Sequence, residues 1–303
     1  MRTSMTAVLI LGLVLHHAQA QPPSKKQGNV ASHASCVNDP SWITPQKPFR
    51  IYGNTWYVGP RGLGVFLVTA CTGDVLIDGG VPGHVSLIEA NIRDLGINLH
   101  DIKWILNSHA HCDHAGGIAQ LAHDTGALVI AGVADVPLLE RGGHDDPEYA
   151  DRFVFPPVHV TRTVSEGEGL RLGELALTAY STPGHTEGNT TWAWTSCEAG
   201  RCLQMVDVGS LSAPDYKLVG NPKYPDIVKD YDHSFALIAA LTCDIPLAPH
   251  PDMVDFWERV AKREQGDADA LIDRAGCRAY AQDARANFKA QLAKQRVDAF
   301  PAK

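Results

Sequence analysis

The feature that most constrains this chain is a histidine-rich run at residues 109–114 (HAHCDH). The run directly follows an apolar segment, Ile102–Leu106, which has the length and composition of a buried strand. Alternate residues of an extended segment face the same side, so His109 and His111 can bind one cation together. The sequence therefore predicts a fold in which a buried strand delivers metal ligands at its end.

Further candidate ligands follow this pair. Asp113 and His114 lie where the chain must turn toward the next helix, and a tight turn at Gly116-Gly117 would let them reach a second cation. His185 and His250 lie in loops, each after a strand-like segment. A single histidine is usually a surface or satisfied core residue, but burying this many imidazoles without a partner would be costly. Three ligands for each of two metals would leave an open coordination position on each, which is typical of a catalytic zinc site.

The composition is that of a globular protein with a large core. Hydrophobic residues make up 45% of the 303 residues and charged residues 20%. The net charge is -8, with Lys and Arg spread along the chain, which argues against nucleic acid as a partner. Short apolar segments alternate with turns, and the C-terminal part is helical, so we expect one domain with a mixed α/β sandwich.

The expected strands are 51–58, 64–69, 75–77, 102–106, 128–130, 158–164, 170–180, 190–194 and 203–206. The expected helices are 84–95, 116–124, 231–241, 254–264 and 268–295. Residues 141–157 are polar and rich in Gly and Pro, which predicts a long surface loop. Loops of this length are often functional. We expect this loop to form one wall of the site, with Phe153 and Phe155 offering apolar contacts.

The first 20 residues read as a signal peptide. Arg2 supplies a positive start, residues 6–15 form an apolar run too short to span a bilayer, and residues 18–20 (AQA) offer a cleavage site. Residues 21–35 are polar and predict a flexible arm, so the folded domain should cover 36–303. We expect secretion to a bacterial periplasm, no stable membrane association afterwards, and a monomer.

Export predicts disulfides rather than free thiols. Seven cysteines leave one over, and the remaining six allow 15 pairings. Proximity favours Cys197–Cys202, and we expect Cys36–Cys71 and Cys243–Cys277, each of the latter two adding roughly 3–4 kcal/mol of stability. Cys112 should then be a packed thiol that faces away from the metals.

On these residues the sequence resembles the metallo-β-lactamase superfamily, and in particular the subclass B3 metallo-β-lactamases. The resemblance is carried by the 109–114 run and by the strings 52–59 (YGNTWYVG), 113–117 (DHAGG), 182–186 (TPGHT), 209–214 (GSLSAP) and 249–251 (PHP). It covers residue 36 to the C-terminus. The resemblance implies an αββα sandwich, that is, two mixed β-sheets flanked by helices, and some members of the subclass carry the three cysteine pairs above.

The resemblance also implies ligands for two zinc ions per chain. The first zinc would be held by His109, His111 and His185, and the second by Asp113, His114 and His250. The implied activity is hydrolysis of the amide bond of penicillins, cephalosporins and carbapenems by a metal-bound hydroxide, which gives antibiotic resistance. Asp113 would orient the nucleophile, and Ser210 and Ser212 would bind the substrate carboxylate.

Four positions depart from the family pattern or leave an alternative open. Gly209 stands where many members have Asp, and Glu187 and Asn189 stand where Pro and a small residue are more usual. Relatives such as glyoxalase II-like thioesterases and lactonases have a metal-bridging Asp near Ser210, and Asp207 could fill that role here if the alignment slipped. A zinc-binding exported protein without catalysis is a third reading, against which the open three-ligand sites count.

Overall fold

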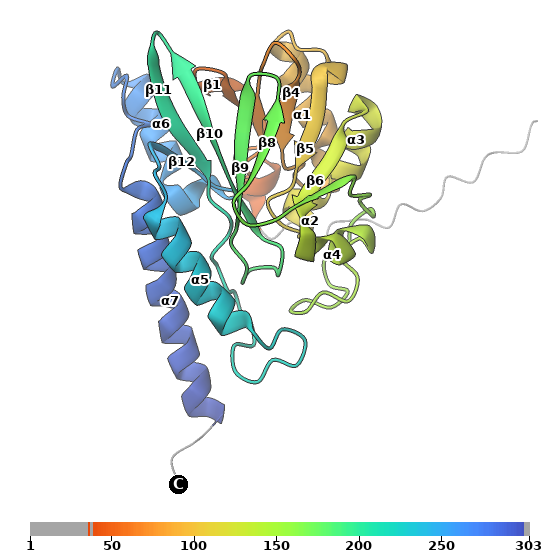
Figure 1. Ribbon diagram of the computed structural model, residues 1–303, viewed down its shortest axis with the longest axis vertical. Helices are drawn as coiled ribbons and strands as arrows, with labels where there is room; N and C mark the ends of the chain where they lie inside the picture. The colour runs from red at the N-terminus through yellow and green to blue at the C-terminus, as the bar shows by residue number, and fades with distance from the viewer. Residues whose placement is uncertain (1–35, 37–38, 300–303) are drawn as a thin grey trace, which may run out of the picture. The chain divides into compact units, whose positions relative to one another are not determined.

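Two β-sheets packed face to face form the centre of the structure (Figure 1). The structure is a computed structural model and describes residue 36 and residues 39–299. The first sheet has seven strands in the order β1 to β7: Phe49–Tyr52, Thr55–Tyr57, Phe66–Val68, Asp74–Ile77, Ile102–Leu106, Leu128–Gly132 and Arg162–Val164. The second sheet has the order β12-β11-β10-β9-β8, and these five strands are Glu168–Leu172 (β8), Leu175–Ser181 (β9), Thr190–Glu198 (β10), Arg201–Asp207 (β11) and Ile245–Leu247 (β12). Both sheets contain parallel and antiparallel pairs, so both are mixed. The predicted signal peptide and most of the arm lie outside the described residues.

Helices lie outside both sheets (Figure 1). They are α1 Val85–Asp94, α2 Cys112–Ala115, α3 Ile118–Thr125, α4 Val136–Glu140, α5 Ile227–Ala240, α6 Phe256–Glu264 and α7 Gly276–Ala299. The buried core on the outer face of the seven-stranded sheet includes side chains of α1 to α4, whereas α5, α6 and α7 contribute to the other core. The predicted αββα sandwich is therefore confirmed.

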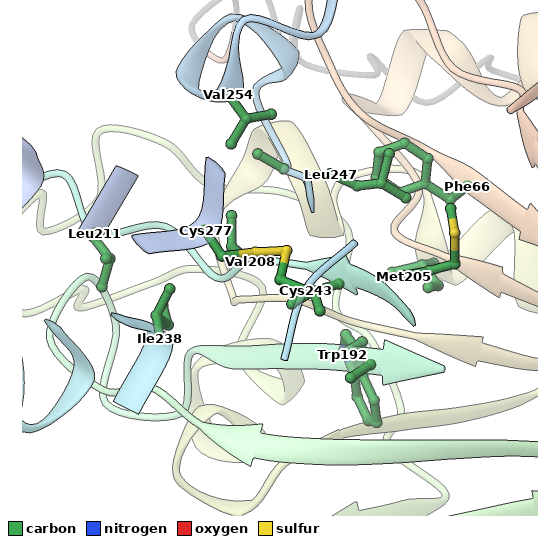
Figure 2. Packing of buried hydrophobic residues seen from close by; sticks show 14 of the residues in the cluster. Phe66, Trp192, Met205, Val208, Leu211, Ile238, Cys243, Leu247, Val254 and Cys277 are labelled. Atoms are coloured by element: carbon green, nitrogen blue, oxygen red, sulfur yellow. A yellow bond between two sulfur atoms is a disulfide. The ribbon is translucent and has the colours of Figure 1, made fainter. Parts of the chain in front are cut away.

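Strand alternation explains why one sheet serves two cores. In β4, Val75 and Ile77 point into the core between the sheets, while Leu76 between them joins the core under α1 and α3. In β5, Leu106 likewise points into the core between the sheets, and Ile105 joins the core under α1 and α3. Figure 2 shows side chains of the first of these cores, which reaches from the two sheets to α5 and α7. Strands buried on both faces read as continuous apolar runs, which is why these segments were recognisable in the sequence.

Two segments expected as single strands are hairpins instead. Residues 51–58 divide between β1 and β2 at Gly53, which has φ +50°. Residues 170–180 divide between β8 and β9 at Gly173, which has φ +59°. Glycine adopts these left-handed angles without the steric penalty that a Cβ brings, so each glycine reverses the chain. The strand at 102–106 agrees with β5 residue for residue.

The disulfides correct one predicted pair. Cys197–Cys202 and Cys243–Cys277 are present as expected, but Cys36 pairs with Cys112 and leaves Cys71 as an exposed free thiol. The predictions that Cys36 pairs with Cys71 and that Cys112 is unpaired were therefore wrong. The reason is topological: Cys71 lies before β4, at the opposite end of that strand from the 109–114 run, whereas Cys112 lies within the run. The Cα atoms of Cys36 and Cys112 are 5.8 Å apart, within the normal range for a disulfide.

Across the residues that the structure describes, none of the helices combines the length and the apolar character needed to cross a membrane.

Candidate metal centre

The candidate ligands converge because three connections meet at one end of the sandwich. His109 and His111 follow β5, and α2 begins directly afterwards and carries Asp113 and His114. His185 lies between β9 and β10, and His250 follows β12. All six predicted ligands are thus brought together from segments up to 141 residues apart in the chain, as the difference between positions 109 and 250 shows.

The first ligand group consists of His109, His111 and His185. One nitrogen from each ring lies within 4.8 Å of the others. All three rings are buried. Burial, reinforced by the neighbouring imidazoles, holds the pKa of His109 and of His185 well below its usual value. Both rings are therefore neutral, which is the form that binds a metal.

The second ligand group consists of Asp113, His114 and His250. Asp113 Oδ2 lies 3.0 Å from His114 Nε2 and 3.2 Å from His250 Nε2, and these two nitrogens are 3.2 Å apart. Burial alone would raise the pKa of Asp113, but the adjacent imidazoles outweigh burial and hold it well below the usual value. The two groups adjoin, because the His109 and His114 ring centroids are 4.3 Å apart.

The arrangement of lone pairs in the first group fits a cation. His185 Nδ1 lies 2.8 Å from the carbonyl oxygen of Ser212 and donates to it, so Nε2 carries a lone pair. His111 Nε2 faces the carboxylate of Asp146 at 3.4 Å, and the tautomer that donates from Nε2 to this carboxylate has its lone pair on Nδ1. These two nitrogens are only 3.1 Å apart, and His109 Nε2 is buried without a hydrogen-bond partner among the described residues. Nitrogens in this arrangement repel unless a cation lies between them, and imidazole with carboxylate is a ligand set that suits zinc.

Two buried aspartates that were not predicted as site residues hold the ligand segments in place. Asp78, directly after β4, accepts hydrogen bonds from Ser108 and lies 3.6 Å from His114 Nδ1. Asp135 accepts bonds from the backbone N–H of Ala110 and from the Thr186 hydroxyl, and so ties the His109 segment to the His185 loop. Burial raises the pKa of each carboxyl to about 6. Position at the end of a buried strand was a signal for Asp78, whereas no local signal marked Asp135.

Gly116 and Gly117 are needed for close packing and not for an unusual turn. Both have negative φ, −59° and −89°. A Cβ on Gly117 would lie 2.3 Å from the carbonyl oxygen of Gly79, and one on Gly116 would lie 2.5 Å from Cδ of Pro82. The two glycines therefore let α2 and α3 approach the end of β4, which corrects the reason predicted for them.

A cleft of about 380 Å³ opens over both ligand groups. Its lining comprises His111, Asp113, His185 and His250 with Cys36, Cys112, Trp42, Tyr149, Phe153, Ser212, Pro214 and Met253. The 141–157 loop thus forms a wall through Phe153 as predicted, but Phe155 is buried in the core and does not line the cleft. Ser212 lines the cleft, and the buried Ser210 lies behind it with its hydroxyl 3.1 Å from that of Ser212.

The departures at Gly209 and Asn189 compensate for each other. The Asn189 amide donates to the carbonyl oxygens of Thr182 and Ser210, at 2.6 and 3.1 Å. A Cβ on Gly209 would lie 2.6 Å from Asn189 Nδ2 and from Thr182 Oγ1. The larger side chain at one position therefore occupies the space that the smaller residue leaves at the other. Glu187 lines a separate cavity next to the His185 loop.

Asp207 is not part of either group. It ends β11 fully buried, and neither of its oxygens has a hydrogen-bond partner in the described part of the chain. Burial, with a smaller contribution from Asp78, raises its pKa well above the usual value. Four histidines outside the two groups, His123, His144, His159 and His233, are exposed.

The sequence and structure are similar to those of metallo-beta-lactamases. A family model described as the metallo-beta-lactamase superfamily matches residues 59–195. The solved structure of Rm3 metallo-beta-lactamase is 41% identical, covers 84% of this chain and 97% of its own, and has a TM-score of 0.80. MEM-A1, a subclass B3 metallo-beta-lactamase from a soil metagenome library, is 42% identical over 85% of this chain and 99% of its own, with a TM-score of 0.81. BJP-1, a subclass B3 metallo-beta-lactamase of Bradyrhizobium japonicum, is 36% identical over 86% of this chain and 98% of its own. Its TM-score is also 0.81.

Curated sequences give shorter matches. Hydroxyacylglutathione hydrolase of Anaeromyxobacter dehalogenans is 31% identical over 117 residues, which is 37% of this chain and 38% of that protein. The chain thus spans little more than a third of the curated relative, against nearly the whole of each solved structure.

Proposed function

This chain belongs to the metallo-β-lactamase superfamily and within it to subclass B3, and we propose that it hydrolyses the amide bond of β-lactam antibiotics with two zinc ions. The observation that carries the proposal is the convergence of two adjoining groups of three His or Asp side chains at one cleft. Three protein ligands for each metal leave a position open for water or substrate, as catalysis requires.

The distances within the two groups support the following ligand assignment. His109, His111 and His185 would hold one zinc, and Asp113, His114 and His250 the other. Zinc bound in such sites lowers the pKa of water toward neutrality and polarises a carbonyl oxygen, which is the chemistry that amide hydrolysis needs.

The chain's own residues would position the substrate and move the proton. The ionised Asp113 lines the cleft and can accept a proton from the attacking water. The Ser212 hydroxyl lies in the same cleft and can donate to the substrate carboxylate, with Ser210 as its hydrogen-bond neighbour. Trp42 and Phe153 offer apolar walls to the rest of the substrate and limit access of bulk water.

The biological role then follows from the substrate. Hydrolysis of penicillins, cephalosporins and carbapenems would confer antibiotic resistance. We further propose a signal peptide at 1–20, a domain from residue 36 onward, action in the periplasm, and a monomer without stable membrane association. Nothing in the site favours the alternative of a lactonase or glyoxalase II-like thioesterase: Asp207, the candidate bridging carboxylate, is absent from both ligand groups.

The direct test is hydrolysis of a chromogenic cephalosporin by the purified protein, first as isolated, then with EDTA, then with zinc restored. S-lactoylglutathione serves as the competing thioester substrate. We expect turnover of the cephalosporin that chelation abolishes and zinc restores, with little thioester cleavage. A zinc-replete protein that cleaves the thioester and leaves the cephalosporin intact would overturn the proposal.

A further inference from the structure

One ring of the first ligand group is oriented differently from the other two. His109 Nδ1 lies 3.0 Å from the Ser108 hydroxyl and His185 Nδ1 lies 2.8 Å from the Ser212 carbonyl oxygen, so both rings direct Nε2 toward the group. His111 is reversed: its Nδ1 faces His185 at 3.1 Å, and its Nε2 points outward. A neutral imidazole has only one N–H, so His111 can offer Nδ1 to a metal only while Nε2 carries the proton.

The outward nitrogen of His111 meets a residue of the 141–157 loop. Asp146 Oδ2 lies 3.4 Å from His111 Nε2, and Asp146 is 5% exposed. Asp146 Oδ1 accepts the backbone N–H groups of Glu148 and Tyr149 at 2.8 and 2.7 Å. With one oxygen occupied by the loop backbone, the other is directed at the imidazole.

The loop that carries Asp146 is itself held in place. Asp146 and Ala150 exchange two backbone hydrogen bonds, of 3.2 and 3.0 Å. The Glu148 carboxylate accepts bonds from the Asn221 amide and the Lys217 backbone N–H. The Tyr149 ring packs 5.3 Å from the His111 ring. These contacts hold the loop in place, and with it the Asp146 carboxylate that faces His111.

We propose that Asp146 is the positioning residue that fixes His111 with Nδ1 toward the metal, so that the 141–157 loop sets the affinity of the first metal site as well as walling the cleft. A carboxylate accepts the Nε2–H and can donate nothing, so it selects the required tautomer. The corresponding partners of His109 and His185 are a hydroxyl and a carbonyl, which makes Asp146 the one carboxylate among them. Partners of this kind affect metal affinity by about 10- to 100-fold. The proposal rests on the metal binding in the proposed function and not on the identity of the organic substrate.

Asp146→Asn separates this role from a purely structural one. The Asn carbonyl oxygen can still accept both loop N–H groups, so the loop is kept. Its NH₂ group would then face His111 Nε2 and favour the tautomer with the proton on Nδ1. The matched control is Asp145→Asn, because the neighbouring Asp145 is exposed and pairs with Lys223, 2.6 Å away.

The experiment measures zinc affinity of the full chain by competition with a chromophoric chelator, followed by cobalt titration and ¹⁵N spectra of the histidine rings. We expect Asp146→Asn to weaken one metal equivalent about 10- to 100-fold, to leave the other unchanged, and to move the His111 proton to Nδ1 in the metal-free protein. Asp145→Asn should behave as wild type. An Asp146→Asn protein with wild-type affinity, or one that loses both equivalents together with its thermal stability, would overturn the proposal. Because no substrate is used, a wild-type protein that binds zinc but spares β-lactams would refute the proposed function alone.

Discussion

The two ligand groups are built in different ways. The first group has three imidazoles, and their outward nitrogens find partners on three separate segments, at Ser108, Asp146 and Ser212. The second group contains a carboxylate and reaches closer to solvent: the side chains of Asp113 and His250 are 15% and 17% exposed, against 1% for His114. The comparison indicates that the first group depends on packing around neutral rings, whereas the second places the negative charge of Asp113 at the cleft.

The largest expected effect comes from removing that charge. Asp113→Ala should lower kcat by several orders of magnitude, because the variant loses both a proposed metal ligand and the group proposed to accept the proton. Steady-state kinetics with a chromogenic cephalosporin measure the loss, and zinc content is determined on the same samples. His123→Ala is a suitable control because that side chain is 81% exposed and should retain full rate. Near-wild-type turnover of Asp113→Ala with two zincs bound would contradict the assigned role.

A second test addresses the packing of Asn189 against Gly209, beside the loop that carries His185 of the first group. Gly209→Asp should lower the free energy of unfolding by about 1–3 kcal/mol, because its Cβ would overlap the Asn189 amide. Adding Asn189→Ser should recover part of that loss by vacating the space. Urea unfolding of the two single variants and the double variant gives the coupling energy. Strict additivity would show that these positions do not share the space.

The third test asks whether a bridging carboxylate joins the two groups. Asp207→Asn should leave turnover and zinc content unchanged, since Asp207 is not among the converging ligand residues. It should raise the free energy of unfolding at pH 7 by about 1–3 kcal/mol, because an ionisable group without a partner is no longer buried. Loss of zinc on this substitution would instead identify Asp207 as a ligand and favour the thioesterase alternative.

The pH dependence of that stabilisation has a definite sign. The pKa of Asp207 is raised in the folded protein, so the folded state binds more protons than the unfolded state above the usual carboxyl pKa of about 3.9. Wild-type stability should therefore fall relative to the variant as the pH rises above about 4, and the difference should stop changing with pH below that value. Unfolding curves from pH 4 to 7 test this; a difference that stays constant with pH would contradict it.

The smallest expected effect concerns the pairing of the cysteines. Cys112 lies in the 109–114 run, between residues of the first and second groups, and belongs to neither group. Because Cys112 is paired with Cys36, thiol labelling without reduction should modify only Cys71. Cys71→Ser should abolish labelling and change turnover by less than about twofold, since Cys71 lines a different hollow from the metal cleft. Peptide mapping that finds Cys71 joined to Cys36 would restore the original pairing.

Local patterns in the chain were sufficient for the parts of the molecule that repeat with strand or helix geometry. The period of two along β5 and the residues after it placed His109 and His111 together, and the apolar run predicted that strand to the residue. The loop histidines could be assigned to the same site because they also follow strands.

The contacts that complete the site were decided only by the tertiary structure. Asp146 meets His111, Asn189 fills the space over Gly209, and Cys36 pairs with Cys112 across 76 positions of sequence. None of these pairs has a characteristic spacing, because each depends on the path of a loop and on which end of the sandwich a segment reaches. Periodicity determines which way a side chain faces within its own strand or helix, whereas the residue that it meets depends on the packing of segments far apart in the chain.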